Sequence, residues 1–264
     1  MLVLAHAAAV LALVAGPLLV GRVTLARMSA VPAEPSGRGA FALGLGAGLF
    51  AAAGVVLLGR LSTLLFLSGI LPAPSPDRAV ALGAVLQAVA VVVAEGLARR
   101  WAFRRAGPAV PARWLGRGFG AAQAALAGLV ALGVMVLAHV LQDGTQGDLV
   151  ALGFDPATAP RVALKLDAWW QVDAAVPLLA AGWAMTRVCL EVGLAAFAGR
   201  ALARGTSPWL PLAALQLPFA LAEELARALA PGLAEGQRVL MVTYGALGLA
   251  GVWMARAASG RPAR

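Results

Sequence analysis

Long apolar stretches dominate this chain and limit what it can fold into. Each is roughly 16 to 24 residues long, the length that an α-helix needs to cross the hydrocarbon core of a bilayer. Only 12% of the 264 residues are charged and 61% are hydrophobic, whereas soluble domains carry about 25% charged residues. This composition excludes a soluble globular enzyme, a disordered chain and a nucleic-acid-binding domain, despite a formal net charge of +9. We therefore expect a multi-pass helical membrane protein surrounded by the lipid bilayer.

The apolar stretches predict an all-α fold, a polytopic transmembrane bundle in which residues 1–264 form one domain of about seven helices. The seven runs, in chain order, are Leu2–Val20, Ala40–Gly59, Ala79–Ala98, Gly118–Leu141, Ala174–Gly199, Trp209–Glu224 and Val239–Ala255. A shorter run, Leu61–Leu71, either extends the second helix or lies at the membrane interface. The first run lacks a basic leader and a small-residue cleavage site, so we interpret it as a retained helix and not as a signal peptide.

Basic residues are distributed unevenly between the predicted loops. With the N-terminus outside, the inside segments hold 14 basic residues and the outside segments hold 6, while Arg187 within a helix completes the 21. The positive-inside rule therefore favours an N-out, C-in topology. The abundance of Ala, Gly, Leu and Arg is typical of a GC-rich bacterial genome, so the predicted location is the bacterial inner membrane. The acidic connection Gln142–Asp173 then lies outside.

Ridges of small residues indicate how these helices pack. Gly44 and Gly48 make one small-xxx-small pair, and Gly120, Ala124 and Gly128 make another. Such ridges let helix backbones approach closely in a membrane, where no hydrophobic force pulls helices together. Because glycine and alanine are abundant throughout the chain, we interpret both ridges as packing faces within one molecule and not as a dimer motif.

Ionisable side chains inside the apolar runs are the strongest candidates for a functional site. A charge at the centre of a membrane helix costs about 2.5–3.5 kcal/mol to insert and usually faces a partner or a cavity. Three clusters combine opposite charges at helical spacing: Glu95 with Arg99, Arg187 with Glu191, and Glu223 and Glu224 with Arg227. For the first and third clusters, simple self-neutralisation is the favoured interpretation. For Arg187 and Glu191, near the predicted midplane, a functional role is equally well supported.

Histidines are too few for a convincing metal site. The chain has only His6 and His139, whereas a catalytic zinc usually takes three protein ligands. His139 and Asp143 are one helical turn apart. They lie at the outer end of the fourth predicted helix, whereas Glu95 lies near the inner end of the third. We therefore predict no bound metal and no cofactor. Cys189 is the single cysteine, so no disulfide can form within the chain.

Three short motifs resemble a known family. The segment Glu95–Phe103 resembles the Glu-Glu-x-x-Arg motif and aromatic continuation of the YhfC family of intramembrane metalloproteases. The segment Gly118–Gln123 stands where family members read Gly-His-Gly-x-x-Glu, and Thr186-Arg187 stands where they read Glu-Arg. The resemblance covers most of the chain, from the second helix to the sixth. It implies a membrane-embedded protease fold.

Substitutions within these motifs imply that the metal chemistry of that family is lost. Gly96 and Thr186 stand in place of glutamates, Phe119 in place of a histidine, and Gln123 in place of a further glutamate. Metal-assisted hydrolysis needs a ligand set and an activated water, and neither set is complete. A weaker half-match, through Glu95, Arg99, His139 and Asp143, resembles the CAAX-type glutamic intramembrane proteases, again with the first glutamate missing.

The sequence leaves three functions open. The leading hypothesis is a catalytically degenerate relative of the YhfC proteases that binds a membrane-protein partner or a substrate helix. Its cavity would be lined by the five candidate site residues, which are Glu95, Arg99, Gln123, Arg187 and Glu191. The first rival is an active intramembrane protease with Glu95 or Glu191 as the base. The second is a transporter or membrane-complex subunit that uses Arg187 and Glu191 at the midplane.

Overall fold

The fold is all-α throughout the part of the chain that the structure describes. The computed structural model describes residues 11, 15, 35–72, 75–107, 110–140, 146–153, 155–160, 162–163, 175–229 and 234–257. The helices in these ranges are α2 (Pro35–Leu67), α3 (Pro76–Ala106), α4 (Ala112–Val140), α5 (Gln146–Ala151), α7 (Ala175–Ala203), α8 (Trp209–Leu229) and α9 (Ala234–Ala257). The all-α part of the predicted fold class is thus confirmed. Six of the seven predicted runs correspond to the long helices, and the run Leu2–Val20 lies outside the described residues.

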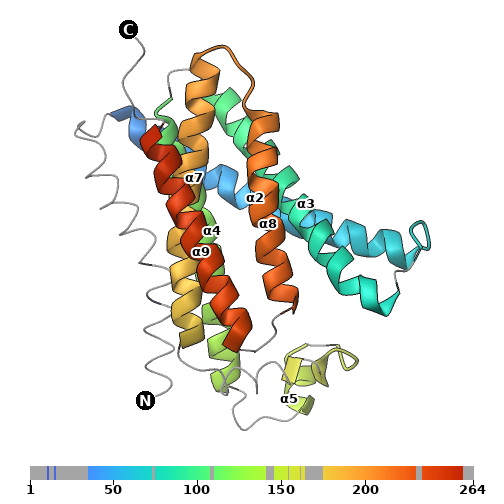
Figure 1. Cartoon of the computed structure of the whole chain (residues 1–264). Coiled ribbons are helices and arrows are strands. Elements are labelled where there is room, and N and C mark those ends of the chain that lie inside the picture. The colour runs from blue at the N-terminus through green and yellow to red at the C-terminus, as the bar shows by residue number, and fades with distance from the viewer. Residues whose placement is uncertain are drawn as a thin grey trace.

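The six long helices are arranged as a ring. Each packs mainly against two neighbours, in the order α2, α4, α7, α9, α8 and α3, and α3 returns to α2. Figure 1 shows α4, α7 and α9 side by side, while the tip of the hairpin formed by α2 and α3 projects away from the bundle. Because α2 and α3 are 33 and 31 residues long, this hairpin extends beyond its contacts with the other helices. The ring brings side chains from helices far apart in sequence to a common interior.

One open alternative is decided by the structure, and several helix ends lie beyond the predicted runs. The run Leu61–Leu71 extends the second helix, because α2 continues without a break to Leu67. The third helix continues to Ala106 and not only to Ala98, and it ends at Gly107, which has a positive φ of 79°. Arg99 is therefore a core residue, 1% exposed, and not a loop residue. When Arg99 is left out of the loop count, the predicted inside segments hold 13 basic residues and the outside segments hold 6.

The small-residue ridges pack helices together within the molecule, as predicted. A β-carbon at Gly44 of α2 would lie 2.0 Å from the carbonyl oxygen of Leu115 in α4. A β-carbon at Gly120 of α4 would lie 2.8 Å from the α-carbon of Val188 in α7. Separations this short leave no room for a side chain. Glycine at these positions lets α4 contact α2 on one side and α7 on the other.

Several large apolar side chains are exposed and several charged ones are buried, which is unusual for a water-soluble protein. Leu57, Leu67 and Trp253 are 69%, 79% and 71% exposed, whereas Glu191 in the interior is 0% exposed. Two segments, Gly37–Leu67 and Ala81–Ala106, are long and apolar enough to cross a membrane. Soluble monomers rarely expose apolar patches larger than a few hundred Å². The described part of the chain is therefore a helical protein with an apolar surface, a charged interior and two candidate membrane spans.

Candidate functional site

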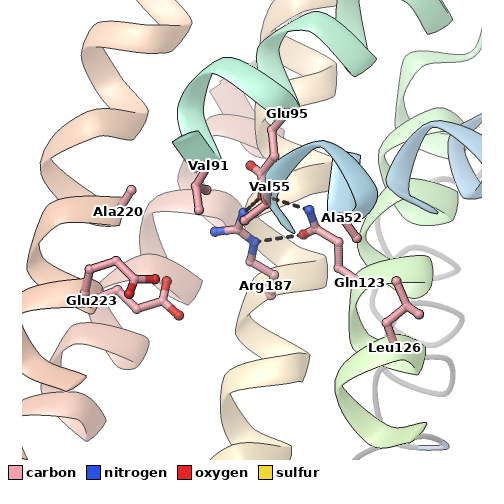
Figure 2. Close-up of a pocket in the computed structure, with 10 residues that line it drawn as sticks. Ala52, Val55, Val91, Glu95, Gln123, Leu126, Arg187, Ala220 and Glu223 are labelled. Carbon is pink, nitrogen blue, oxygen red and sulfur yellow. Dashed lines mark hydrogen bonds and ion pairs between the residues drawn. The ribbon is translucent and has the colours of Figure 1, made fainter. Parts of the chain in front are cut away.

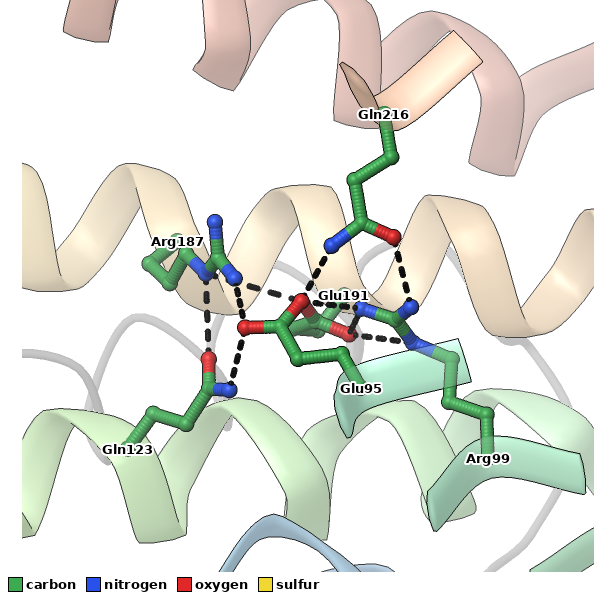
Figure 3. Close-up of polar contacts among 6 residues, drawn as sticks. All are labelled: Glu95, Arg99, Gln123, Arg187, Glu191 and Gln216. Carbon is green, nitrogen blue, oxygen red and sulfur yellow. Dashed lines mark hydrogen bonds and ion pairs between the residues drawn. The ribbon is translucent and has the colours of Figure 1, made fainter. Parts of the chain in front are cut away.

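Six polar side chains from four helices meet inside the ring and form one connected network. They are Glu95 and Arg99 of α3, Gln123 of α4, Arg187 and Glu191 of α7, and Gln216 of α8. Figure 3 shows the side chains converging on the carboxylate of Glu95. The network has two carboxylates and two guanidinium groups, so its formal charges balance. We call these six residues the buried network.

Glu95 is the centre of the buried network. Its Oε1 atom accepts hydrogen bonds from Gln123 Nε2, at 2.7 Å, and from Arg187 Nη2. Its Oε2 atom accepts from Arg99 Nη2, at 2.9 Å, and from Gln216 Nε2. An ionised carboxylate offers about four lone-pair sites, and four donors occupy them here. Glu95 therefore has no lone pair left to receive a proton from a water molecule.

Glu191 is held by Arg99. Arg99 Nε lies 3.0 Å from Glu191 Oε2, and Arg99 Nη2 lies 2.7 Å from Glu191 Oε1, which makes the contact bidentate. Such fork-to-fork pairs are the strongest and most directional ion pairs in proteins. Arg187 Nε is farther away, 3.5 Å from Glu191 Oε1. The main countercharge of Glu191 is thus on α3 and not one turn away on its own helix, as the spacing had indicated.

Phe119 packs against Arg99 of the buried network. The guanidinium carbon of Arg99 lies 4.9 Å from the centroid of the Phe119 ring, a cation–π distance, and Phe119 is fully buried. The aromatic face therefore supports the arginine that holds Glu191. The described residues contain no group of three or more His, Cys, Asp or Glu side chains that could hold a metal ion.

A pocket of about 210 Å³ adjoins the buried network. Its polar wall is formed by Glu95, Gln123 and Arg187, with Glu223 and Glu224 on the α8 side. Its apolar wall is formed by Ala52, Val55, Val91, Leu126 and Ala220. Figure 2 shows Ala220 and Glu223 across the pocket from Arg187. A water molecule fills about 30 Å³ in the liquid, so the pocket is large enough for a side chain or several waters.

The buried network separates this pocket from a packed apolar core. On α3, the pocket residue Val91 precedes Glu95, while the core residues Ala102 and Phe103 follow Arg99. On α7, the core residues Leu194 and Ala198 likewise lie beyond Glu191. The half of the ring near the end of α3 and the start of α4 is therefore filled with side chains. The other half contains the pocket, with Glu95, Gln123 and Arg187 at its base.

The structure brings all five candidate site residues together but divides them between two surroundings. Glu95, Gln123 and Arg187 line the pocket, whereas Arg99 and Glu191 lie behind them and are 1% and 0% exposed. The expected i,i+4 pair of Glu95 and Arg99 forms, at 2.9 Å, but both side chains also bind groups on other helices. The side chain of His139, together with His6 and Asp143, lies outside the described residues.

Gln216 was missed by the sequence analysis, which searched the apolar runs for charged residues. It is 2% exposed and accepts a hydrogen bond from Arg99 Nη1, at 2.8 Å, through its Oε1 atom. Its signal in the sequence is an amide within the otherwise apolar stretch Leu212–Ala220 of α8. A buried amide needs hydrogen-bond partners, so isolated glutamines in apolar helices are candidates for such networks.

Comparison with known proteins gives no match for this chain, whether among family models, curated proteins or solved structures. The function is therefore argued from the geometry of the buried network and its pocket.

Proposed function

We propose that this chain is a polytopic protein of the bacterial inner membrane that binds a membrane partner or substrate helix in the pocket, without hydrolysing it. An apolar exterior and a charged interior support the membrane location. The pocket offers a mixed surface that suits a transmembrane helix carrying one polar residue. One polar side chain of that helix would enter the pocket, where the apolar wall would pack against its stem and Arg187 and Glu223 would face its polar group.

The proposal that the partner is not hydrolysed rests on one observation. Every lone-pair site of the Glu95 carboxylate already accepts a hydrogen bond. A general base must have a lone pair within hydrogen-bond reach of the water it activates. The four lone-pair sites of Glu95 are occupied by Gln123, Arg187, Arg99 and Gln216. Glu191 lies behind Arg99 and does not line the pocket. The rival protease hypothesis would therefore require the buried network to open before either carboxylate could act.

The transport hypothesis has less support from the packing. A transport path would need to continue from the pocket past the buried network to the opposite face. That half of the ring contains Leu115, Phe119, Leu190 and Leu194, each 1% exposed or less. A pocket closed at one end suits binding better than passage. We keep the relationship to the YhfC proteases as part of this proposal. A relative that has lost the metal ligands could retain the site as a binding pocket.

Site-specific photo-crosslinking tests this proposal. A photoreactive amino acid at Leu126 would face the pocket, and the same amino acid at Leu129, 59% exposed on the same helix, serves as the matched control. We expect an intact membrane protein to be captured from Leu126 and not from Leu129. An Ala220→Trp substitution, which fills the pocket, should abolish that capture. Circular dichroism of each variant would establish that the helices are retained.

Two outcomes would overturn the proposal in favour of its rivals. Release of partner fragments, abolished by Glu95→Gln, would identify a protease. A pH-dependent flux in reconstituted vesicles, abolished by Glu191→Gln and without capture at Leu126, would identify a transporter.

A further inference from the structure

Arginines gather at one end of the ring. The ends of α3, α7 and α9 and the beginnings of α2, α4 and α8 meet there, because Gly199 of α7 contacts Ala112 of α4 and Phe103 of α3 contacts Trp209 of α8. Arg200 at the end of α7 also donates a hydrogen bond to the carbonyl oxygen of Ala257 in α9. Six arginines at these helix ends are exposed, and we call them the arginine rim: Arg38, Arg100, Arg104, Arg105, Arg204 and Arg256.

The arginine rim carries a charge of one sign only. Among the described residues of these helix ends, which are 35–39, 100–107, 110–118, 200–209 and 253–257, none is acidic. Positive charges clustered on one face attract anions and repel other cations. A guanidinium presents a planar fork that binds phosphate oxygens in pairs. The chemistry of the rim therefore favours a partner that carries phosphates.

Tryptophans mark the same end of the ring. The four tryptophans whose side chains the structure describes are Trp101, Trp114, Trp209 and Trp253, and each lies within about two helical turns of a helix end at the rim. Trp101 and Trp253 are 49% and 71% exposed. Tryptophan is enriched where membrane helices pass from hydrocarbon to headgroups. This distribution is independent of the arginines and indicates the same boundary.

Apolar surface begins directly beside the arginine rim. Leu97 precedes Arg104 by seven residues on α3, about 10 Å along the helix axis, and is 59% exposed. Leu210 of α8 and Leu249 of α9 are 81% and 74% exposed. A partner that matches both surfaces needs a phosphate-bearing head and an apolar body. Nucleic acids carry phosphates without an apolar body, and acidic proteins carry carboxylates in place of phosphates.

We infer that the arginine rim binds the headgroups of anionic phospholipids, whose acyl chains lie against the adjoining apolar surface. This inference rests on the proposed membrane location and goes beyond it, because it states which lipids surround one end of the protein. It also fixes the orientation of the pocket, which lies on the side of the buried network away from the rim. The pocket therefore opens toward the opposite leaflet.

Lipid selectivity in reconstituted vesicles tests the inference. The full chain is placed in phosphatidylcholine vesicles, and spin-labelled phosphatidylglycerol or spin-labelled phosphatidylcholine reports the fraction of lipid immobilised by the protein. An arginine beside an anionic headgroup raises local affinity about fivefold. We expect a severalfold preference for the anionic lipid that decreases as salt is added.

Substitutions assign the preference to the rim. The triple change Arg100→Gln, Arg104→Gln and Arg105→Gln should reduce the selectivity to near one. Arg104→Gln alone should lower it, whereas Arg60→Gln, an exposed arginine of α2 far from the rim, should not. If the triple variant loses helical content, the two single variants still decide the question. Equal selectivity in the parent and in the Arg104 variant, or an equal effect of Arg60→Gln, would overturn the inference.

Failure of the inference and failure of the membrane location can be told apart. Extraction of cell membranes with alkaline carbonate should leave the chain in the membrane fraction. Release by carbonate would contradict the membrane location itself. Retention without any preference for the anionic lipid would contradict only the assignment of the rim.

Discussion

Gln123 and Gln216 lie on opposite sides of the Glu95 carboxylate, and each joins it to a different arginine. Gln123 donates to Glu95 Oε1 and accepts from Arg187 Nε, while Gln216 donates to Glu95 Oε2 and accepts from Arg99 Nη1. Gln123 of α4 therefore bridges a charge of α3 to a charge of α7, whereas Gln216 of α8 bridges two charges of α3. Each amide fixes the position of one guanidinium relative to the central carboxylate.

Removal of one amide bridge should destabilise the protein. Gln216→Leu takes a donor from Glu95 and an acceptor from Arg99, both of which stay buried. Leaving a buried polar group without its partner costs about 1–3 kcal/mol. We expect a lower melting temperature in detergent for Gln216→Leu. Gln87→Leu, on α3 but outside the buried network, is the control and should change the melting temperature little.

The ion pairs should show strong coupling between α3 and α7. Glu191→Leu leaves Arg99 and Arg187 with only one carboxylate, and breaking a buried pair on one side costs about 3–5 kcal/mol. Arg187→Leu should cost less, because Arg99 still holds Glu191 with two hydrogen bonds. The double change restores charge balance and should recover part of the loss. Melting curves of the four proteins measure this coupling, and equal stability across the set would show that water screens these charges.

Two glycines of α2 offer a matched test of helix packing. Gly44→Ala places a methyl group 2.0 Å from the Leu115 carbonyl oxygen, so α2 and α4 must separate. A change of the same type at Gly46, where nothing lies within 4 Å, should raise stability by about 0.5–1 kcal/mol, because alanine favours a helix over glycine. We expect the two substitutions to shift the melting temperature in opposite directions. Shifts of the same sign would contradict the close packing of α2 on α4.

Cysteine accessibility tests the proposed topology. In a Cys189→Ala background, single cysteines are placed at Gly147 in α5 or at Ala112 beside the arginine rim. A membrane-impermeant thiol reagent should label the Gly147 position in intact cells and leave the Ala112 position unlabelled until the membrane is opened. External labelling at Ala112 would reverse the orientation argued from the basic residues.

The sequence predicts the helices and most members of the buried network, but not how they are paired. Long apolar runs and rare charges within them identify the helical segments and Glu95, Arg99, Arg187 and Glu191, because burying a charge in an apolar helix is costly. Helical spacing pairs each arginine with the carboxylate one turn away. The order of the helices in the ring depends on tertiary packing, which helical spacing does not reveal. This packing places Arg99 of α3 against Glu191 of α7 across the interior. Gln216 escapes detection for a related reason, since an amide costs less to bury than a charge.

Given the proposed membrane location, the local spacing of the charges bears on how the helices enter the bilayer and assemble. Arg99 precedes its partner Glu191 by 92 residues, so α3 would enter the bilayer long before α7 is available. Glu95 lies one turn from Arg99, and Arg187 lies one turn from Glu191, so each helix carries its own countercharge during insertion. Once α3 and α7 pack together, Arg99 forms an ion pair with Glu191, and Arg187 forms one with Glu95. The same four charges thus first neutralise one another within single helices and later form the ion pairs that join the two helices.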